Sequence, residues 1–197
     1  QIPLSITLTQ REIIWISIAR RQCVPHEHDI GINRCHCVYE IVCGALNFVS
    51  GNSSRVTDRF FLGSGQFRGF SPGGVGPREF DKDSSINDAL GGEYYAVARF
   101  ETQFPIGMPE EYGIELGAFF HAGSLWGLSS THVGVGSDSK AHPHTILYDD
   151  FTLRAVAGLS IFWNTPIGPL RFNFTDAVKK AAHDVAQNFD LTVSTLF

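Results

Sequence analysis

Residues of the types that bind metal ions gather first in a Cys- and His-containing stretch near the start of this 197-residue sequence. Thiolates and imidazoles are the ligands that zinc prefers, and the candidates are Cys23, His26, His28, Cys35, His36 and Cys37. Their spacing matches no standard zinc finger, because the Cys-x-Cys pair is tighter than the usual Cys-x2-Cys pair. We therefore interpret the stretch as an irregular segment with incidental thiols and predict no metal site there.

A second group of possible ligands lies in and beside a polar loop over residues 123–149, rich in Gly, Ser and His. The group comprises His132, Asp138, His142, His144, Asp149 and Asp150. A solvated loop is the favoured interpretation, so no metal ion or other cofactor is predicted. No Ser-His-Asp or paired-carboxylate arrangement stands out either. The sequence therefore does not indicate an enzyme.

The third stretch, residues 65–78, places one arginine among aromatic residues in a loop. Half of its residues are Gly or Pro, which excludes a helix or an ordinary strand. Its glycines could cradle a phosphate, but the stretch has neither a Gly-Lys-Ser/Thr ending nor a Gly-x-Gly-x-x-Gly pattern between strand and helix. A loop of this length is usually functional or disordered. The Phe67-Arg68-Gly69-Phe70 core argues against disorder.

The composition limits the possible partners. The net charge is −5 and no basic block is present, so a nucleic-acid partner is not expected. No run of eighteen apolar residues marks a membrane-spanning helix. The mean hydropathy of −0.01 suits a transmembrane β-barrel and a soluble protein equally well.

The strands that position this loop are predicted from the alternation of apolar and polar residues. Period-2 alternation predicts strands over 45–49, 94–104, 114–122, 152–161, 170–175 and 189–197. Residues 176–187 are predicted to form a loop or one or two helical turns. Short and long connections alternate, as in outer-membrane barrels, although a soluble β-sandwich binding module would give the same strands. The aromatic C-terminal residue Phe197 favours the barrel.

Several motifs, taken in their order along the chain, resemble those of the bacterial surface-antigen superfamily, and within it the outer-membrane protein assembly factors. They are Arg68-Gly69-Phe70, residues 73–78, Leu90-Gly91-Gly92, Glu101, Phe104-Pro105, residues 163–170 and Phe197. The resemblance covers about residues 44–197. It implies an all-β fold: the C-terminal portion of a transmembrane antiparallel β-barrel, about five or six strands, with a long loop inserted into the lumen.

The resemblance also implies a function. Members of the family insert other β-barrel proteins into the bacterial outer membrane without nucleotide or covalent chemistry. A weak seam joins the first and last strands of the barrel, and a client strand pairs there by β-augmentation. The implied partners are outer-membrane lipids, client barrels, accessory assembly lipoproteins and periplasmic domains N-terminal to the barrel. A secretion or translocation transporter of the same superfamily is the alternative.

The site residues implied by the resemblance form a clamp on the lumen loop. Arg68, with Gly69 and Phe70, reaches a carboxylate on the barrel wall, and Glu101 stands at the matching acidic position. A buried guanidinium needs such a partner because its desolvation is costly, and its planar fork suits a carboxylate. His121 stands where the family has a second acidic residue, so a weaker, pH-dependent clamp is expected.

The last strand supplies the second set of site residues, the C-terminal signal and one side of the seam: Phe189, Leu191, Val193 and Phe197.

Residues 1–43 are predicted to be an atypical segment that does not match the family, whereas residues 44–197 form the C-terminal part of the barrel domain. All four cysteines lie at or before Cys43, and the segment shows no strand alternation. A translated frameshift would produce such a segment. The upstream coding sequence tests this hypothesis.

Overall fold

The computed structural model describes residues 12–23, 36–47, 54–81, 86–106, 109–129, 145–165 and 168–193. Within these ranges the regular structure consists of strands and two 3-10 turns, η1 (Val56–Asp58) and η2 (Glu110–Tyr112). None of the described helical segments is long and apolar enough to cross a membrane. The all-β prediction is confirmed.

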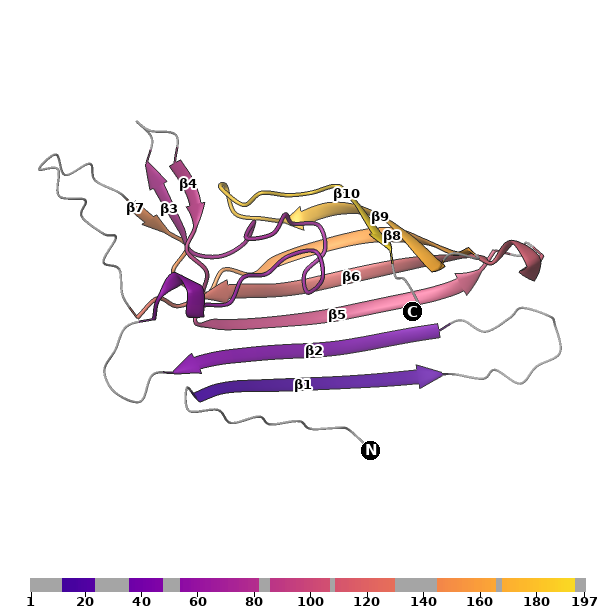
Figure 1. Ribbon diagram of the computed structural model, residues 1–197, viewed down its shortest axis with the longest axis horizontal. Helices are drawn as coiled ribbons and strands as arrows, with labels where there is room; N and C mark the ends of the chain where they lie inside the picture. Colours follow the sequence, from indigo (N-terminus) through magenta and orange to yellow (C-terminus); the bar gives the residue numbers. More distant parts are fainter. Residues whose placement is uncertain are drawn as a thin grey trace, which may run out of the picture.

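The main element is a seven-stranded antiparallel sheet (Figure 1). Its strands, in spatial order, are β1 (Glu12–Cys23), β2 (His36–Asn47), β5 (Tyr94–Pro105), β6 (Ile114–Trp126), β8 (Arg154–Thr165), β9 (Gly168–Lys179) and β10 (Phe189–Val193). Each strand pairs with the next sheet strand along the chain, which is the connectivity of an up-and-down barrel wall. A soluble sandwich would need a second sheet facing this one. Here the concave face is covered by the loop instead.

The two faces of this sheet have inverted polarity relative to a soluble protein. On β5, Arg99 and Glu101 share the loop-facing side with buried Tyr95 and Val97, while Phe100 on the other side is 46% exposed. Large apolar side chains exposed on the sheet strands include Ile41, Phe100, Phe120, Leu159, Trp163, Phe174 and Val178. An apolar outward face and a polar inward face are the pattern of a membrane barrel wall.

The apolar core lies between the loop and the inward face of the sheet. Leu62, Phe67, Phe70 and Val75 come from the loop, whereas Tyr95, Val97, Leu125 and Val156 come from the wall. Phe67 and Phe70 have no exposed surface, and their rings lie 5.1 Å apart. Burial of their apolar area therefore contributes to loop docking.

A small three-stranded sheet replaces parts of two predicted loops. It comprises β4 (Ile86–Ala89), β3 (Arg78–Asp81) and β7 (Thr145–Leu147), in the order β4-β3-β7. Figure 1 shows it beyond one end of the long strands. The polar composition of these segments gives no strand pattern. In addition, β7 pairs with β3 across a long sequence separation, which local patterns do not reveal.

The expectation that no strand precedes residue 44 is wrong. β1 and β2 pair in continuous register from Glu12 opposite Asn47 to Cys23 opposite His36, and β2 then pairs with β5. Apolar residues occupy both faces of β2, so period-2 alternation is not visible there. With these strands the sheet has seven members rather than about five or six. The division into an atypical segment, residues 1–43, and a barrel part, residues 44–197, stays a prediction, as does the hypothesis of a frameshift.

The C-terminal connection also differs from its prediction. β9 continues to Lys179, so residues 176–179 extend the strand instead of forming a loop or helical turns. A register shift opposite Ala155 and Ala157 accommodates the extension. The remaining segment, residues 180–188, is a connection that contacts the lumen loop.

Candidate functional site

The loop over residues 60–77 touches the wall closely at Gly69. Gly69 has a φ of 85°, and a Cβ added there would lie 2.5 Å from Thr175 Cγ2 and 3.0 Å from Val156 Cγ1. Both the backbone conformation and the close contact require glycine. The close approach of Gly69 therefore keeps the preceding residue, Arg68, near the inward face of the sheet.

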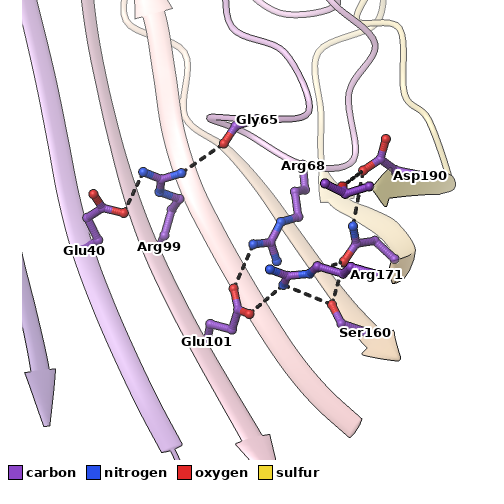
Figure 2. A network of polar contacts seen from close by, with 10 residues as sticks. Glu40, Gly65, Arg68, Arg99, Glu101, Ser160, Arg171 and Asp190 are labelled. Atoms are coloured by element: carbon purple, nitrogen blue, oxygen red, sulfur yellow. Dashed lines mark hydrogen bonds and ion pairs between the residues drawn. The ribbon is translucent and has the colours of Figure 1, made fainter. Parts of the chain in front are cut away.

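Arg68 pairs with Glu101 of β5 beneath the loop (Figure 2). Arg68 Nη2 donates to Glu101 Oε2 at 2.8 Å, and the two side chains are only 14% and 16% exposed. The guanidinium also lies 4.7 Å from the ring centroid of Phe119. A partly buried, charge-assisted bond of this kind is stronger than a surface ion pair.

Glu101 is shared between two arginines. Its second oxygen accepts a hydrogen bond from Arg171 Nη2 of β9 at 2.6 Å. The Arg171 guanidinium lies 4.5 Å from the Phe162 ring centroid, and its Nε donates to Asn173 Oδ1 at 2.9 Å. One carboxylate therefore links the loop, β5 and β9.

A third arginine holds the loop from the other side. Arg99 Nη1 donates to the carbonyl oxygen of Gly65 at 3.1 Å, and its Nη2 pairs with Glu40 of β2 at 2.6 Å. Figure 2 shows Arg99 reaching from β5 toward Gly65 of the loop, and Arg68 reaching from the loop toward Glu101 of β5. The loop is thus fixed on both flanks by charged groups.

The loop backbone also pairs with the connection between β9 and β10. Phe70 forms a bridge with Ala186, Ser71 N donates to Val185 O at 3.0 Å, and Gln187 N donates to Gly69 O at 2.9 Å. These bonds satisfy backbone groups that would otherwise be buried without partners. They fix the segment that leads into β10.

A second ion pair anchors that same connection. Arg154 Nε and Nη2 donate to the two oxygens of Asp184 at 2.9 and 3.1 Å, and neither side chain has exposed surface. Asp184 also accepts a hydrogen bond from Ala181 N at 2.7 Å. The bidentate geometry offsets the desolvation of both charges.

Arg78 closes the far end of the loop. Its Nη1 donates to Gly73 O at 2.7 Å, and its Nε and Nη2 donate to Asn87. Burial lowers the pKa of the Arg78 guanidinium, whereas the carboxylates of Asp184 and Asp88 act in the opposite direction. Arg78 therefore ties the loop to the small sheet.

This arrangement of a curved antiparallel sheet enclosing an arginine loop has a counterpart in known proteins. The family model described as "Omp85 superfamily domain" matches residues 27–197. The chain belongs to the Omp85 superfamily. The resemblance seen in the motifs is thereby confirmed.

Two curated relatives of this Omp85 segment share one description. It is 33% identical over 135 residues to the outer membrane protein assembly factor BamA of Neorickettsia risticii, covering 68% of this chain and 16% of that protein. It is 29% identical over 147 residues to the protein of the same name from Neisseria meningitidis, covering 68% of this chain and 18% of that one. The chain spans less than a fifth of these relatives.

A solved structure shows the same fold. The crystal structure of BamA from Haemophilus ducreyi lacking POTRA domains 1-3 matches with a TM-score of 0.69 and 23% identity. The match covers 93% of this chain and 35% of that chain. The fold prediction, part of an outer-membrane β-barrel, is confirmed.

His121 of the Omp85 segment lies in the site as an aromatic group. It is 1% exposed, and its ring lies 5.2 Å from the Phe119 ring and 6.4 Å from the Phe67 ring. Among the described residues, neither ring nitrogen has a hydrogen-bond partner. The structure therefore brings Arg68 and Glu101 together, and places His121 beside them by packing alone.

The predicted seam residues lie on β10. Phe189, Leu191 and Val193 are 48%, 47% and 56% exposed on one face of the strand. Within the described part of the chain, β10 pairs only with β9. Phe197 lies outside the described residues.

Sequence reasoning missed Arg171, Arg99 and Arg154. All three occupy inward positions of alternating strands, so their polar character among apolar neighbours was the available signal. Their partners lie on other strands, and alternation alone does not pair them.

Three of the six metal candidates of the first stretch lie outside the described residues: His26, His28 and Cys35. The same holds for His132, Asp138, His142 and His144 of the polar loop. In the ranges that the structure describes, no group of three potential ligands lies close enough to hold a metal. Cys37 Sγ contacts Thr102 Oγ1 at 3.5 Å, and Cys37 and Cys43 are unpaired thiols.

Proposed function

We propose that this chain is the C-terminal part of the barrel of an outer-membrane protein assembly factor, which inserts client β-barrel proteins into the bacterial outer membrane. The observation that carries the proposal is the edge of β10. In the described residues β10 has one neighbour, and its outward face is apolar. A strand with this edge can accept a client strand through main-chain hydrogen bonds.

The docked loop supports the same function. Arg68 binds Glu101 of β5, and Gly69 lies against Val156 of β8 and Thr175 of β9, so a strand can pair at the edge while the wall keeps its shape. Such an activity needs no catalytic group, nucleotide or metal. The proposed partners are outer-membrane lipids, client barrels, accessory lipoproteins and periplasmic domains.

Reconstitution tests the proposal. The protein as the cell makes it is placed in liposomes, a urea-unfolded client barrel is added, and folded client is measured by its heat-modifiable gel mobility. We expect faster folding than in protein-free liposomes. Equal rates would overturn the proposal, and delivery of the client into the vesicle lumen would favour a secretion transporter of the superfamily instead.

Cross-linking locates the pairing edge. The four native cysteines are replaced by serine, and Thr192→Cys is compared with Asn164→Cys. Asn164 is exposed, but its strand β8 has neighbours on both sides. We expect a disulfide from position 192 to a cysteine in the client's terminal strand and none from position 164.

A further inference from the structure

The polar network beneath the loop extends to the inward face of β10. Asp190 Oδ2 accepts a hydrogen bond from Asn173 Nδ2 at 3.2 Å and one from Thr192 Oγ1 at 3.2 Å. Asn173 is 1% exposed, and its Oδ1 accepts hydrogen bonds from Arg171 Nε and Ser160 Oγ. Figure 2 shows the chain of contacts running from Arg68 to Asp190.

The link between the loop and this network is the shared carboxylate. Arg68 and Arg171 each hold one oxygen of Glu101, at 2.8 and 2.6 Å. In a partly desolvated site, removing one arginine changes both the electrostatic environment and the orientation of the other arginine. Undocking of Arg68 would leave Glu101 to Arg171 alone and shift the guanidinium that orients Asn173.

The segment before β10 has an anchor on the wall that does not involve Arg68. Asp184 is fixed by the fully buried pair with Arg154 of β8, whereas Ala186 is bridged to Phe70 of the loop itself. Beyond Gln187, β10 has five residues and one described neighbour. Asp190 is the first inward-facing residue past this anchor, since Phe189 and Leu191 lie on the outward face.

We propose that Asp190 is a positioning residue that couples docking of the lumen loop to pairing of β10 with β9. A docked loop keeps Arg171 and Asn173 oriented toward Asp190, and β10 stays paired. Release of β10 weakens loop docking by the same factor, because the coupling is reciprocal. The consequence for client insertion rests on the proposed function, but the coupling itself does not.

Hydrogen exchange on the lipid-reconstituted protein, without client, tests the coupling. Asp190→Ala is expected to speed amide exchange about tenfold in β10 and also in residues 65–74, since a charge-assisted bond is lost. Asp176→Ala removes an exposed carboxylate from β9 and serves as the control. Unchanged exchange in residues 65–74 of Asp190→Ala would overturn the proposal.

A double-mutant cycle distinguishes coupling from general loosening. In an Arg171→Met background the side-chain path through Glu101 is cut, so Asp190→Ala should still affect β10 but should affect residues 65–74 much less than in the unsubstituted protein. Additive effects on the loop would refute the coupling. If Asp190→Ala does not fold, Asn173→Ser breaks the same bond from β9 and carries the same expectations.

The exchange experiment tests the coupling and the reconstitution experiment tests the proposed function, so each result can be negative while the other is positive. Normal client insertion with no loop response to Asp190→Ala removes the coupling and leaves the proposed function. A loop response without client insertion by the unsubstituted protein removes the function and leaves the coupling.

Discussion

A methyl group added at Gly69 would overlap the barrel wall. Its Cβ would lie 2.5 Å from Thr175 Cγ2, and the residue has a φ of 85°. Gly69→Ala is therefore expected to destabilise loop docking by about 2–3 kcal/mol, measured as faster hydrogen exchange over residues 65–78. Gly65→Ala is the control, because nothing lies within 4 Å of its added Cβ. Equal exchange in both variants would contradict this account.

The pair of Arg154 and Asp184 has no exposed surface, so an unpaired partner is costly. Asp184→Leu should destabilise the protein by about 3–5 kcal/mol because it leaves a buried guanidinium without its carboxylate partner. Arg154→Met combined with Asp184→Leu should cost less than Asp184→Leu. The temperature at which gel mobility changes reports the difference. A double variant less stable than Asp184→Leu would refute this reasoning.

His121 can contribute through a polar interaction or through aromatic packing, and two substitutions distinguish these roles. A carboxylate there would lie near Arg68, whose buried Nη1 has no hydrogen-bond partner among the described residues. His121→Asp is expected to slow hydrogen exchange over residues 65–78, and unchanged exchange would refute a polar role. His121→Phe should change stability by less than about 1.5 kcal/mol, because the site already holds an aromatic ring.

At the scale of the element, the two faces of a strand should respond oppositely to charge. Phe174 on β9 is 49% exposed on the outward face. Phe174→Arg should cost about 2–4 kcal/mol of stability in lipid. Gln103→Arg on the inward face of β5 is the comparison and should cost much less. Urea unfolding from vesicles measures both, and equal costs would argue against a lipid-facing surface.

At the scale of the molecule, the described strands leave two edges. β1 and β10 bound the seven-stranded sheet, whereas membrane barrels close with eight or more strands. Expressed alone, these 197 residues should pair edge to edge and aggregate. Light scattering coupled to size exclusion in detergent checks this. A monomer with heat-modifiable mobility would show that the chain closes by itself.

Local features of the sequence were sufficient for the loop and for most of the wall from β5 onward, but not for β1 and β2. Alternation along residues 94–104 and 189–193 predicts strands because side chains of a strand point to opposite faces in turn. The Gly/Pro content of residues 65–78 excludes regular structure for a similarly local reason. The assignment of Arg68 to Glu101 came from the family resemblance, and the structure places these two side chains in contact.

Tertiary structure alone decided which groups meet across strands. The pairing of β2 with β5, the sharing of Glu101 with Arg171, the pairing of Arg154 with Asp184 and the packing of His121 against Phe67 all bring together segments that are separated in the chain. A period-2 pattern states which face a residue occupies but not its cross-strand neighbour. The sequence, through its patterns and its family resemblance, therefore determined that an arginine loop faces a polar wall, whereas folding decided that the wall links this loop to β10.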